Sequence, residues 1–595
     1  MTPPARRAPY IPTPKTRRSQ LISVFGPGSI MDTLYDSVTL KGLGHWPAPK
    51  MEDRIEDVRL QSALSVDFFY QPPPYIEGTR EDRLPALKFP RFHYCPSCHQ
   101  LTDDFLPQER KRDGVRCTAC KKTRMVPARF VAACSRGHAQ DFPFREWSHS
   151  GLTACAELLS MLTLGKSASL RDIRIQCDCG KGRSMEGAFS EGALKKVGVG
   201  CAGLHLWRSS TTAGCDSDLR ALQRGASNFY FAETMSSLLI PPWEGKIADL
   251  VRRFRLFTDG AYPDSKVPEH TMMLELALKQ ARYTGLTTSD VFDWTSQLNQ
   301  ARGASRDPIA YKEEEFRAFS RGVSSDTERP RFSLRSVEVP DSLRPFVQQL
   351  VLADVLEEVR ALIGFRRIDP WSDGPEAGPV GNLVEIREDR VPWLPGVRLT
   401  GEGIFVRFST DPLDEWAAHD RITKRVKLLQ AQLDYQVAAG KRKPVKITGR
   451  RLFLHSLAHS LMIRMSLDCG YSSGAIRERI YSGDPTEQRE RDMAGFLIFT
   501  GSTDSEGTLG GLVSMGETES FERVFLNAVN DAEWCSSDPI CSDTRNAGER
   551  TLNLSACHAC LFVPETSCEN FNSLLDRQTL VGDLDGNDGY LTPLL

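Results

Sequence analysis

Two pairs of closely spaced cysteines constrain the fold of this chain more than any other sequence feature. They follow the pattern Cys95-x2-Cys98-x18-Cys117-x2-Cys120. Each x2 pair can form a tight turn that presents two thiolates to one ion, and two such turns complete a tetrahedral site. The spacing therefore predicts a zinc ribbon. Because four thiolates leave no open coordination position, we expect this site to stabilise the fold and not to catalyse a reaction.

The compartment decides how the sixteen cysteines of this 595-residue chain are interpreted. No apolar run approaches the roughly 18 residues of a membrane span, and the first twenty residues lack the apolar core of a secretory signal. These features predict a cytoplasmic protein with no membrane association. Disulfides are rare in the cytoplasm, so paired cysteines there are typical of metal sites. At roughly 150 residues per domain, the length indicates three or four domains.

A second set of cysteines follows the ribbon at Cys177, Cys179, Cys201 and Cys215. Glycine or aspartate stands beside each of them, as the tight turns around a metal ion require. The spacing is less regular than that of the ribbon. We nevertheless predict a second four-cysteine zinc site in this part of the chain.

A third set lies near the C-terminus, with the spacing Cys541-x15-Cys557-x2-Cys560-x7-Cys568. Its x2 pair can form a metal-binding turn, and the two outer cysteines can reach the same ion from flanking turns. Such a knot would hold the end of the chain against a helix predicted at 452–471. Together with the other two sets, it predicts about three structural zinc ions.

Four residues near these sets could not be assigned from the sequence. Cys134 and His138 are four positions apart, and they could bind zinc or be a buried thiol and a hydrogen-bonded histidine. Cys155 and Cys535 likewise stand outside the three predicted sites. For all four residues, metal binding stays open.

The segments between the cysteine sets predict helices and short strands. Residues 244–335 are polar with helical stretches, and we interpret them as a variable helical connector. A strand is predicted at 401–409 and a helix at 414–436. Apolar residues three or four apart also predict an amphipathic helix that ends at Gly364, with an apolar face of Phe346, Leu350, Val351, Val355, Val359 and Leu362.

The resulting fold class is α+β and multidomain. It combines N-terminal zinc-ribbon-like modules, a helical connector, and a mixed α/β C-terminal domain closed by the four-cysteine zinc knot. The expected divisions are an N-terminal arm with a small α/β segment (1–90), the ribbon (91–150), the second cysteine module (151–243), the connector (244–335) and the C-terminal domain (336–595).

Basic residues gather in blocks although the formal net charge is only -2. Two blocks, 110–136 and 421–451, are candidates for contact with nucleic-acid phosphates. A solvated protein surface is the simpler interpretation of either block alone. The residues expected to contact DNA are Arg110, Lys111, Arg112, Arg116, Lys121, Lys122, Arg124, Lys424, Arg425, Lys441, Arg442 and Lys443.

The sequence contains no phosphate-binding loop, nucleophile motif or paired-carboxylate nuclease signature. His455 and His459 would share one helical face, but Ser456 stands where a metalloprotease helix of this type has its glutamate. We expect these histidines to be buried and hydrogen-bonded, and we predict no catalytic residue. The alternative is a metal-dependent hydrolase, for instance a nuclease, in which Asp504 and Glu506 join the two histidines.

Several phrases carry a resemblance to a known family. The chain opens with arginine, serine, an apolar run and Gly26-Pro27-Gly28, followed by an aspartate and by GLGHW at 42–46. The cysteine phrases and the segment RGASNFYFAETMSSLLIPPW at 224–243 come next. In this order the phrases resemble the DrmB family of the DISARM anti-phage system, and the C-terminal part resembles an MrfA-like zinc-binding domain. For the Gly-Pro-Gly segment we expect only a structural turn.

The resemblance implies a function for the whole chain. It implies a non-catalytic subunit that associates with an SF2-type helicase, DrmA, beside a DNA methyltransferase that marks self DNA, as in restriction–modification. Helicases with the MrfA-like domain carry it fused to their motor. A chain with this domain and no motor is therefore expected to bind a motor in trans and to help hold DNA.

Overall fold

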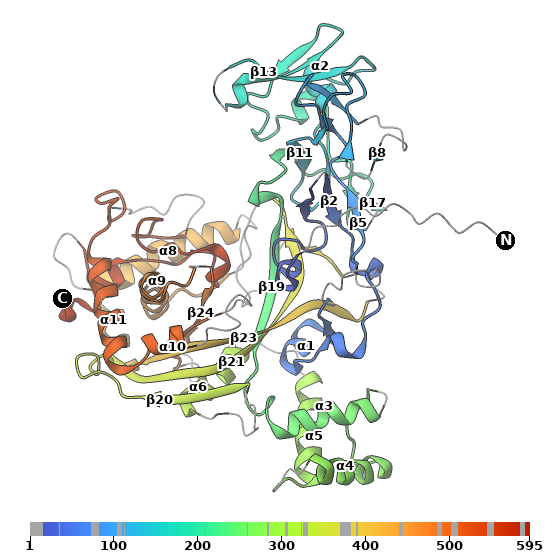
Figure 1. The fold of residues 1–595 in the computed structure, drawn as a ribbon. Helices are drawn as coiled ribbons and strands as arrows, with labels where there is room; N and C mark the ends of the chain where they lie inside the picture. The colour runs from blue at the N-terminus through green and yellow to red at the C-terminus, as the bar shows by residue number, and fades with distance from the viewer. Residues whose placement is uncertain are drawn as a thin grey trace.

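The computed structural model describes most of the chain. The described residues are 16–34, 36–72, 83–103, 110–111, 114–165, 167, 169–208, 210–258, 260–281, 285–303, 308–322, 324, 331–368, 382–387, 391–438, 444–472, 474–484, 491–500, 510–543, 552–583 and 589–595. Its arrangement is mixed α/β, with a sheet of long strands across the middle, a cysteine-rich part at one end and a group of helices at the other (Figure 1). No helix among the described residues is both long enough and apolar enough to span a membrane.

A nine-stranded sheet forms the centre of the molecule. Its main path runs in the order β19-β21-β23-β25-β24, with β3, β4, β20 and β22 paired at its sides. The strands are β3 (Arg54–Ile55), β4 (Phe68–Tyr70), β19 (Phe231–Leu238), β20 (Phe332–Val337), β21 (Val347–Arg366), β22 (Val384–Glu385), β23 (Trp393–Phe408), β24 (Ile476–Ser482) and β25 (Ala494–Thr500). Residues from both halves of the chain therefore share one sheet.

The amphipathic helix predicted before Gly364 is wrong, because this segment is the 20-residue strand β21. Both sides of β21 are covered, so apolar residues occur on both of its faces and their spacing imitates a helical stripe. Leu350 and Leu352 face one apolar core, whereas Val351 and Ala353 face another. Successive side chains of β21 do point to opposite faces of the sheet. Because both faces are buried, however, the sequence lacks the clear polar–apolar alternation of a strand with one exposed face. Gly364 lies within the strand and does not end a helix.

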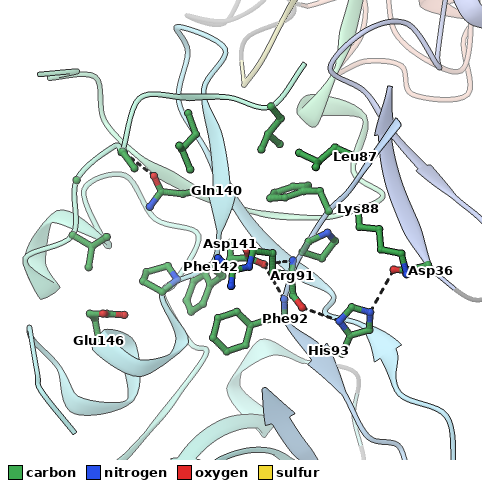
Figure 2. Close-up of a pocket in the computed structure, with 18 of the residues that line it drawn as sticks. Asp36, Leu87, Lys88, Arg91, Phe92, His93, Gln140, Asp141, Phe142 and Glu146 are labelled. Carbon is green, nitrogen blue, oxygen red and sulfur yellow. Dashed lines mark hydrogen bonds and ion pairs between the residues drawn. The ribbon is translucent and has the colours of Figure 1, made fainter. Parts of the chain in front are cut away.

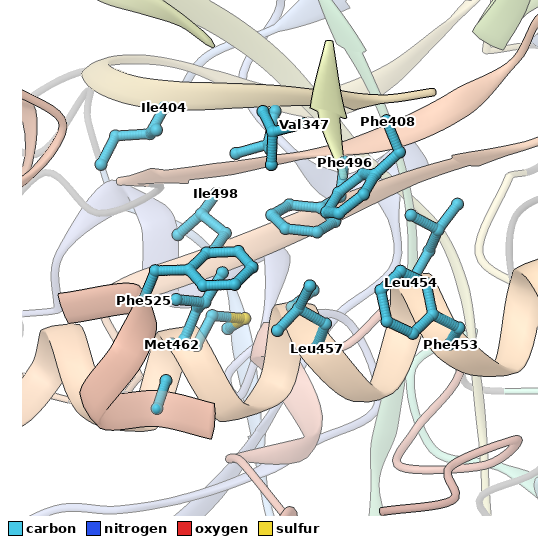
Figure 3. Packing of buried hydrophobic residues seen from close by; sticks show 14 of the residues in the cluster. Val347, Ile404, Phe408, Phe453, Leu454, Leu457, Met462, Phe496, Ile498 and Phe525 are labelled. Atoms are coloured by element: carbon cyan, nitrogen blue, oxygen red, sulfur yellow. The ribbon is translucent and has the colours of Figure 1, made fainter. Parts of the chain in front are cut away.

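Helices of the C-terminal part cover one face of this sheet. Helix α9 (Gly449–Cys469) is buried along most of its length and packs Phe453, Leu454 and Leu457 against sheet residues such as Phe496 and Ile498 (Figure 3). Its left-handed cap at Gly470 ends it as glycine commonly does. Around it lie α7 (Thr410–Ala417), α8 (Asp420–Ala438), α10 (Gly511–Met515), α11 (Thr518–Glu533) and α12 (Gln578–Val581).

The described residues of the predicted connector include four helices, and one of these belongs to the core. Helices α3 (Lys246–Phe257), α4 (Pro268–Ala281) and α5 (Thr288–Gly303) share a separate apolar cluster. Helix α6 (Pro308–Arg321) instead covers the second face of the central sheet, where Phe316 and Phe319 contact Phe405 and Tyr481. The connector is therefore helical, but its last helix, α6, packs on the central sheet and not with the other three helices.

The N-terminal segment packs against the C-terminal half of β21. It contains the short helix Arg18–Ile22, α1 (Val58–Leu64), and a three-stranded sheet of β1 (Ile30–Asp32), β2 (Ser37–Leu40) and β5 (Ala86–Lys88). At the Gly-Pro-Gly turn, a Cβ on Gly26 would lie only 2.2 Å from the Tyr230 hydroxyl. Buried Arg367 donates a 2.8 Å hydrogen bond to the Gly28 carbonyl. Close packing therefore accounts for the turn without a ligand.

The cysteine-rich part is built from short strands. A six-stranded sheet has the order β10-β6-β7-β13-β14-β15, and a three-stranded sheet has the order β12-β11-β18. The strands are β6 (His93–Tyr94), β7 (Gln100–Thr102), β10 (Val126–Pro127), β11 (Phe130–Ala133), β12 (Ala139–Asp141), β13 (Leu159–Thr163), β14 (Ile173–Cys177), β15 (Gly182–Ser184) and β18 (Arg220–Gln223), with small pairs β8 (Arg110–Lys111)/β9 (Gly114–Val115) and β16 (Leu204–His205)/β17 (Ser210–Thr211) and helix α2 (Phe144–His149). Because β7 pairs with β13, one sheet crosses the division expected at residue 150.

Candidate metal centres

The ribbon cysteines come together as their spacing predicts. Sγ of Cys98 lies 3.4 Å from Sγ of Cys117, and Sγ of Cys95 lies 3.7 Å from Sγ of Cys120. All four sulfur atoms lie within 4.8 Å of one another. Lys121 has a positive φ of 55°, which lets the second turn fold back on itself. The geometry suits one tetrahedral ion.

The second predicted set is not one site in the structure. Cys177 and Cys179 belong to one group, whereas Cys201 and Cys215 belong to another. Each pair is completed by two residues that the sequence left unassigned or did not suggest. The spacing of the cysteines could not reveal these two groups, because the whole of one group lies in the sequence between the two pairs of the other.

Cys134 and His138 join Cys201 and Cys215. The first two lie at the turn between β11 and β12, where Gly137 has a φ of 86°. Sγ of Cys134 is 3.4 Å from Nδ1 of His138 and 3.6 Å from Sγ of Cys201. The hydrogen bond with Cys201 lowers the pKa of Cys134 to about 5. A readily formed thiolate at this position is what a metal ligand needs.

The other group contains His149, Cys155, Cys177 and Cys179. Nε2 of His149 lies 3.2 Å from Sγ of Cys179, and its Nδ1 donates to the carbonyl of Arg145 at 2.8 Å. That second contact fixes the tautomer, so Nε2 carries the lone pair and faces the sulfur atoms. His149 was not predicted from the sequence, where its one signal is its position six residues before Cys155.

The C-terminal group also differs from the predicted set. It contains Cys535, Cys541, Cys557 and Cys560, with Sγ–Sγ distances of 3.6 Å from Cys535 to Cys557 and 3.8 Å from Cys541 to Cys560. Cys535 takes the place that the spacing assigned to Cys568. A cis Asp538-Pro539 bond lies between the first two cysteines of this group.

Cys568 lies instead beside His455, His459 and Glu478. Both histidines are fully buried on α9 and are hydrogen-bonded. Burial lowers the pKa of His455, and burial together with the Glu478 carboxylate raises the pKa of the Cys568 thiol. Asp504 and Glu506, the acids of the alternative hydrolase site, lie outside the described residues. No sequence signal indicated Glu478, which comes from the neighbouring strand β24.

The basic residues expected to contact DNA differ in their exposure and in how much of each residue the structure describes. Around the second ribbon turn, Arg116, Lys121, Lys122 and Arg124 are exposed. In the second block, Lys424 is exposed and pairs with Asp420, whereas Arg425 donates to the buried carboxylate of Asp576 at 2.7 Å. For Arg110 and Lys111 only the backbone is described, and Arg112, Lys441, Arg442 and Lys443 lie outside the described residues.

A cavity of about 690 Å³ lies between β5 and the cysteine-rich part. Two of its carboxylates have partners within the protein: that of Asp36 lies 3.4 Å from Nε2 of His93, and that of Asp141 accepts a hydrogen bond from the backbone N–H of Arg91 at 2.8 Å (Figure 2). Asp36 also pairs with Lys88. Neighbouring groups of the protein therefore hold both of these carboxylates in place.

Comparison with known proteins agrees with this geometry. The family model described as the MrfA Zn-binding domain matches residues 457–561, a range that contains all four cysteines of the C-terminal group and ends before Cys568. A domain of unknown function (DUF8724) matches residues 17–231. The DISARM protein DrmB of Bacillus paralicheniformis is 32% identical over 574 residues, which cover 93% of this chain and 98% of that relative. The chain belongs to the DrmB family.

Within this DrmB-family chain, the cysteine-rich groups and the matched Zn-binding domain point to zinc as the metal. The four cysteine-rich groups contain either four sulfur ligands or three sulfur ligands and one imidazole. Both sets are typical of structural zinc. The DUF8724 match covers three of these groups, and the Zn-binding domain match covers the fourth.

Proposed function

We propose that this chain is a non-catalytic component of DISARM anti-phage defence, stabilised by zinc, that associates with a DrmA-type helicase and helps to hold DNA. The observation that carries the proposal is the similarity to a DISARM protein over nearly the whole chain. The anti-phage role rests on this kinship. DNA methyltransferase and other DISARM subunits are further candidate partners.

Four groups, each with a complete set of four ligands, support a non-catalytic role. In a closed tetrahedral site, zinc has no position for a water molecule or substrate. The expected metal content of these groups is therefore four structural ions, one more than the sequence alone suggested. Their role would be to hold short strands and turns in place where the apolar cores are small.

Two features support association with a motor and with DNA. The MrfA Zn-binding domain is present, and, as the resemblance described above implies, helicases that carry it have it fused to their motor. Exposed basic side chains also surround the second ribbon turn. Such side chains can contact phosphates without reading the base sequence.

Co-expression with the DrmA-type helicase from the same organism tests the partner. We expect the full chain to co-purify with the helicase, and the complex to bind DNA more tightly than the helicase alone. Failure of the two proteins to associate at equal expression would contradict the proposal. The cytoplasmic location expected from the sequence is part of the same proposal, because the DNA and the motor are there.

A nuclease assay separates this proposal from the metal-dependent hydrolase. Purified chain would be incubated with linear and single-stranded DNA in the presence of Mg²⁺, Mn²⁺ or Zn²⁺. The subunit proposal expects intact DNA in every case. Cleavage that is lost in His455→Ala and retained in an exposed-residue variant such as Lys266→Ala would support the hydrolase instead.

A further inference from the structure

Four side chains on three different elements point their ligand atoms at one another in the C-terminal core. Nε2 of His455 lies 3.0 Å from Oε1 of Glu478 and 3.2 Å from Sγ of Cys568. Nε2 of His459 lies 3.3 Å from the same carboxylate oxygen. All four ligand atoms lie within 4.8 Å of one another, as in the cysteine-rich groups. We propose that these residues bind one divalent transition-metal ion, most suitably zinc, in a site separate from the four cysteine-rich groups.

Hydrogen bonds to backbone carbonyls fix both imidazole rings. Nδ1 of His455 lies 3.1 Å from the carbonyl oxygen of Leu574, and Nδ1 of His459 lies 2.7 Å from that of Leu561. A carbonyl oxygen can only accept, so each Nδ1 must carry the hydrogen. In the neutral rings, both Nε2 atoms therefore present lone pairs to the group. This is the outer-shell arrangement that orients metal-binding histidines.

The group has more acceptors than hydrogens. Two Nε2 lone pairs face the Glu478 carboxylate, whose Oε1 accepts one backbone hydrogen bond, from the N–H of Glu569 at 3.3 Å. Among the four side chains, only the Cys568 thiol has a proton to share. Oε2 of Glu478 is buried and has no hydrogen-bond partner among the described residues. Two buried imidazolium ions could supply protons, but burying two such charges against one carboxylate is costly. A divalent cation would accept one lone pair from each of the four side chains, and with a carboxylate and a thiolate it would make the site neutral.

The backbone around Cys568 resembles that around the other metal-binding candidates. Its Sγ accepts hydrogen bonds from the backbone N–H groups of Asn570 and Asn572, each at 3.3 Å. Cys201, Cys535 and Cys557 accept the same bond from the residue two positions later, each at 3.4 Å. These bonds stabilise a thiolate. By contrast, the thiol of Cys469 donates to the carbonyl of Met465 at 2.6 Å and so keeps its proton. All sixteen cysteines lie in the described part of the chain, and Cys469 is the one that joins no group.

The ligand set and its surroundings define what such an ion would do. Imidazole nitrogen, thiolate sulfur and carboxylate oxygen are all ligands that zinc accepts, and the four side chains complete a tetrahedral site. A cavity of about 450 Å³ borders Glu478 and Cys568 and provides an entry route. The ion would join the segment after Cys568 to α9 and β24, and its role would be structural.

Metal content of the full chain tests the proposal. Glu478→Gln is the most informative variant, because its amide can donate a hydrogen to an imidazole and so fits a metal-free site well. We expect Glu478→Gln and Cys568→Ser each to lose one equivalent of zinc per chain, and Cys469→Ser to lose none. Because each variant is compared with the wild type, this difference is independent of how many cysteine-rich groups are filled.

Anomalous scattering from crystals of the wild-type chain at the zinc edge gives a readout that does not depend on variant folding. We expect a peak between the four side chains. The proposal is overturned if that position has no peak, or if a folded Glu478→Gln variant keeps the wild-type metal content. Loss of peaks at a cysteine-rich group, with this peak retained, would count against the zinc assignment of that group alone.

Discussion

Nη1 of Arg479 lies 2.8 Å from both carboxylate oxygens of Glu315, although the two residues are 164 positions apart. Glu315 comes from α6 and is fully buried. Its carboxylate also accepts hydrogen bonds from Arg59 at 3.1 Å and from the Tyr481 hydroxyl at 3.2 Å. One carboxylate therefore links the N-terminal segment, the connector and the central sheet.

We expect Glu315→Ala to be strongly destabilising. It leaves the buried guanidinium groups of Arg59 and Arg479 without this partner, and breaking a buried ion pair in this way costs roughly 3–5 kcal/mol. The measurement is the midpoint of thermal unfolding of the purified chain. Glu275→Ala, which removes the same charge from an exposed position on α4, is the matched control. Equal midpoints for the two variants would refute this contribution of the Glu315 carboxylate.

The division of the second cysteine set predicts a distinctive zinc count. Cys179→Ser should remove one ion, and the double variant Cys179→Ser/Cys215→Ser should remove two, because these cysteines lie in different groups. A single site containing both would lose only one ion in either variant. Metal analysis of the folded proteins decides between these outcomes.

The ribbon should unfold without the rest of the chain. Its cysteines share a small apolar cluster with Val115 and Met125, so bound zinc supplies most of the free energy that holds this tip. In Cys95→Ser/Cys98→Ser, limited proteolysis should cleave near the ribbon and leave a C-terminal fragment with the central sheet intact. Degradation of the whole chain at the same protease concentration would refute this independence.

The exposed basic side chains at the ribbon tip predict the salt dependence of DNA binding. If Lys121, Lys122 and Arg124 each contact a phosphate, replacing all three with alanine should reduce the slope of log K against log salt by roughly 2 to 3 for the helicase complex. Sequence preference should not change, because phosphate contacts do not read bases. Lys266→Ala/Lys279→Ala, on the exposed surface of the connector, is the control. An unchanged slope with loss of the helicase would place the tip at a protein interface.

The sequence by itself determined the features that depend on neighbouring residues. The ribbon spacing predicted a group of four sulfur atoms, and the apolar pattern at 452–471 predicted a helix. The structure contains both, the latter as α9. The family phrases pointed to the DrmB family, which the 32% identity confirms. In each case, the residues that decide the outcome lie close together in the chain or in a fixed order.

Tertiary structure alone decided which distant residues meet. Cys535, not Cys568, completes the C-terminal group, because the turn at 535–541 brings it to the x2 pair while Cys568 lies against α9. Strand β21 was mistaken for a helix because both of its faces are covered, by α9 on one side and α6 on the other. Burial on two faces removes the polar–apolar alternation by which a strand is recognised in a sequence. When the ligands of one metal group lie in the sequence between those of another, the spacing of the cysteines no longer shows which residues share a site.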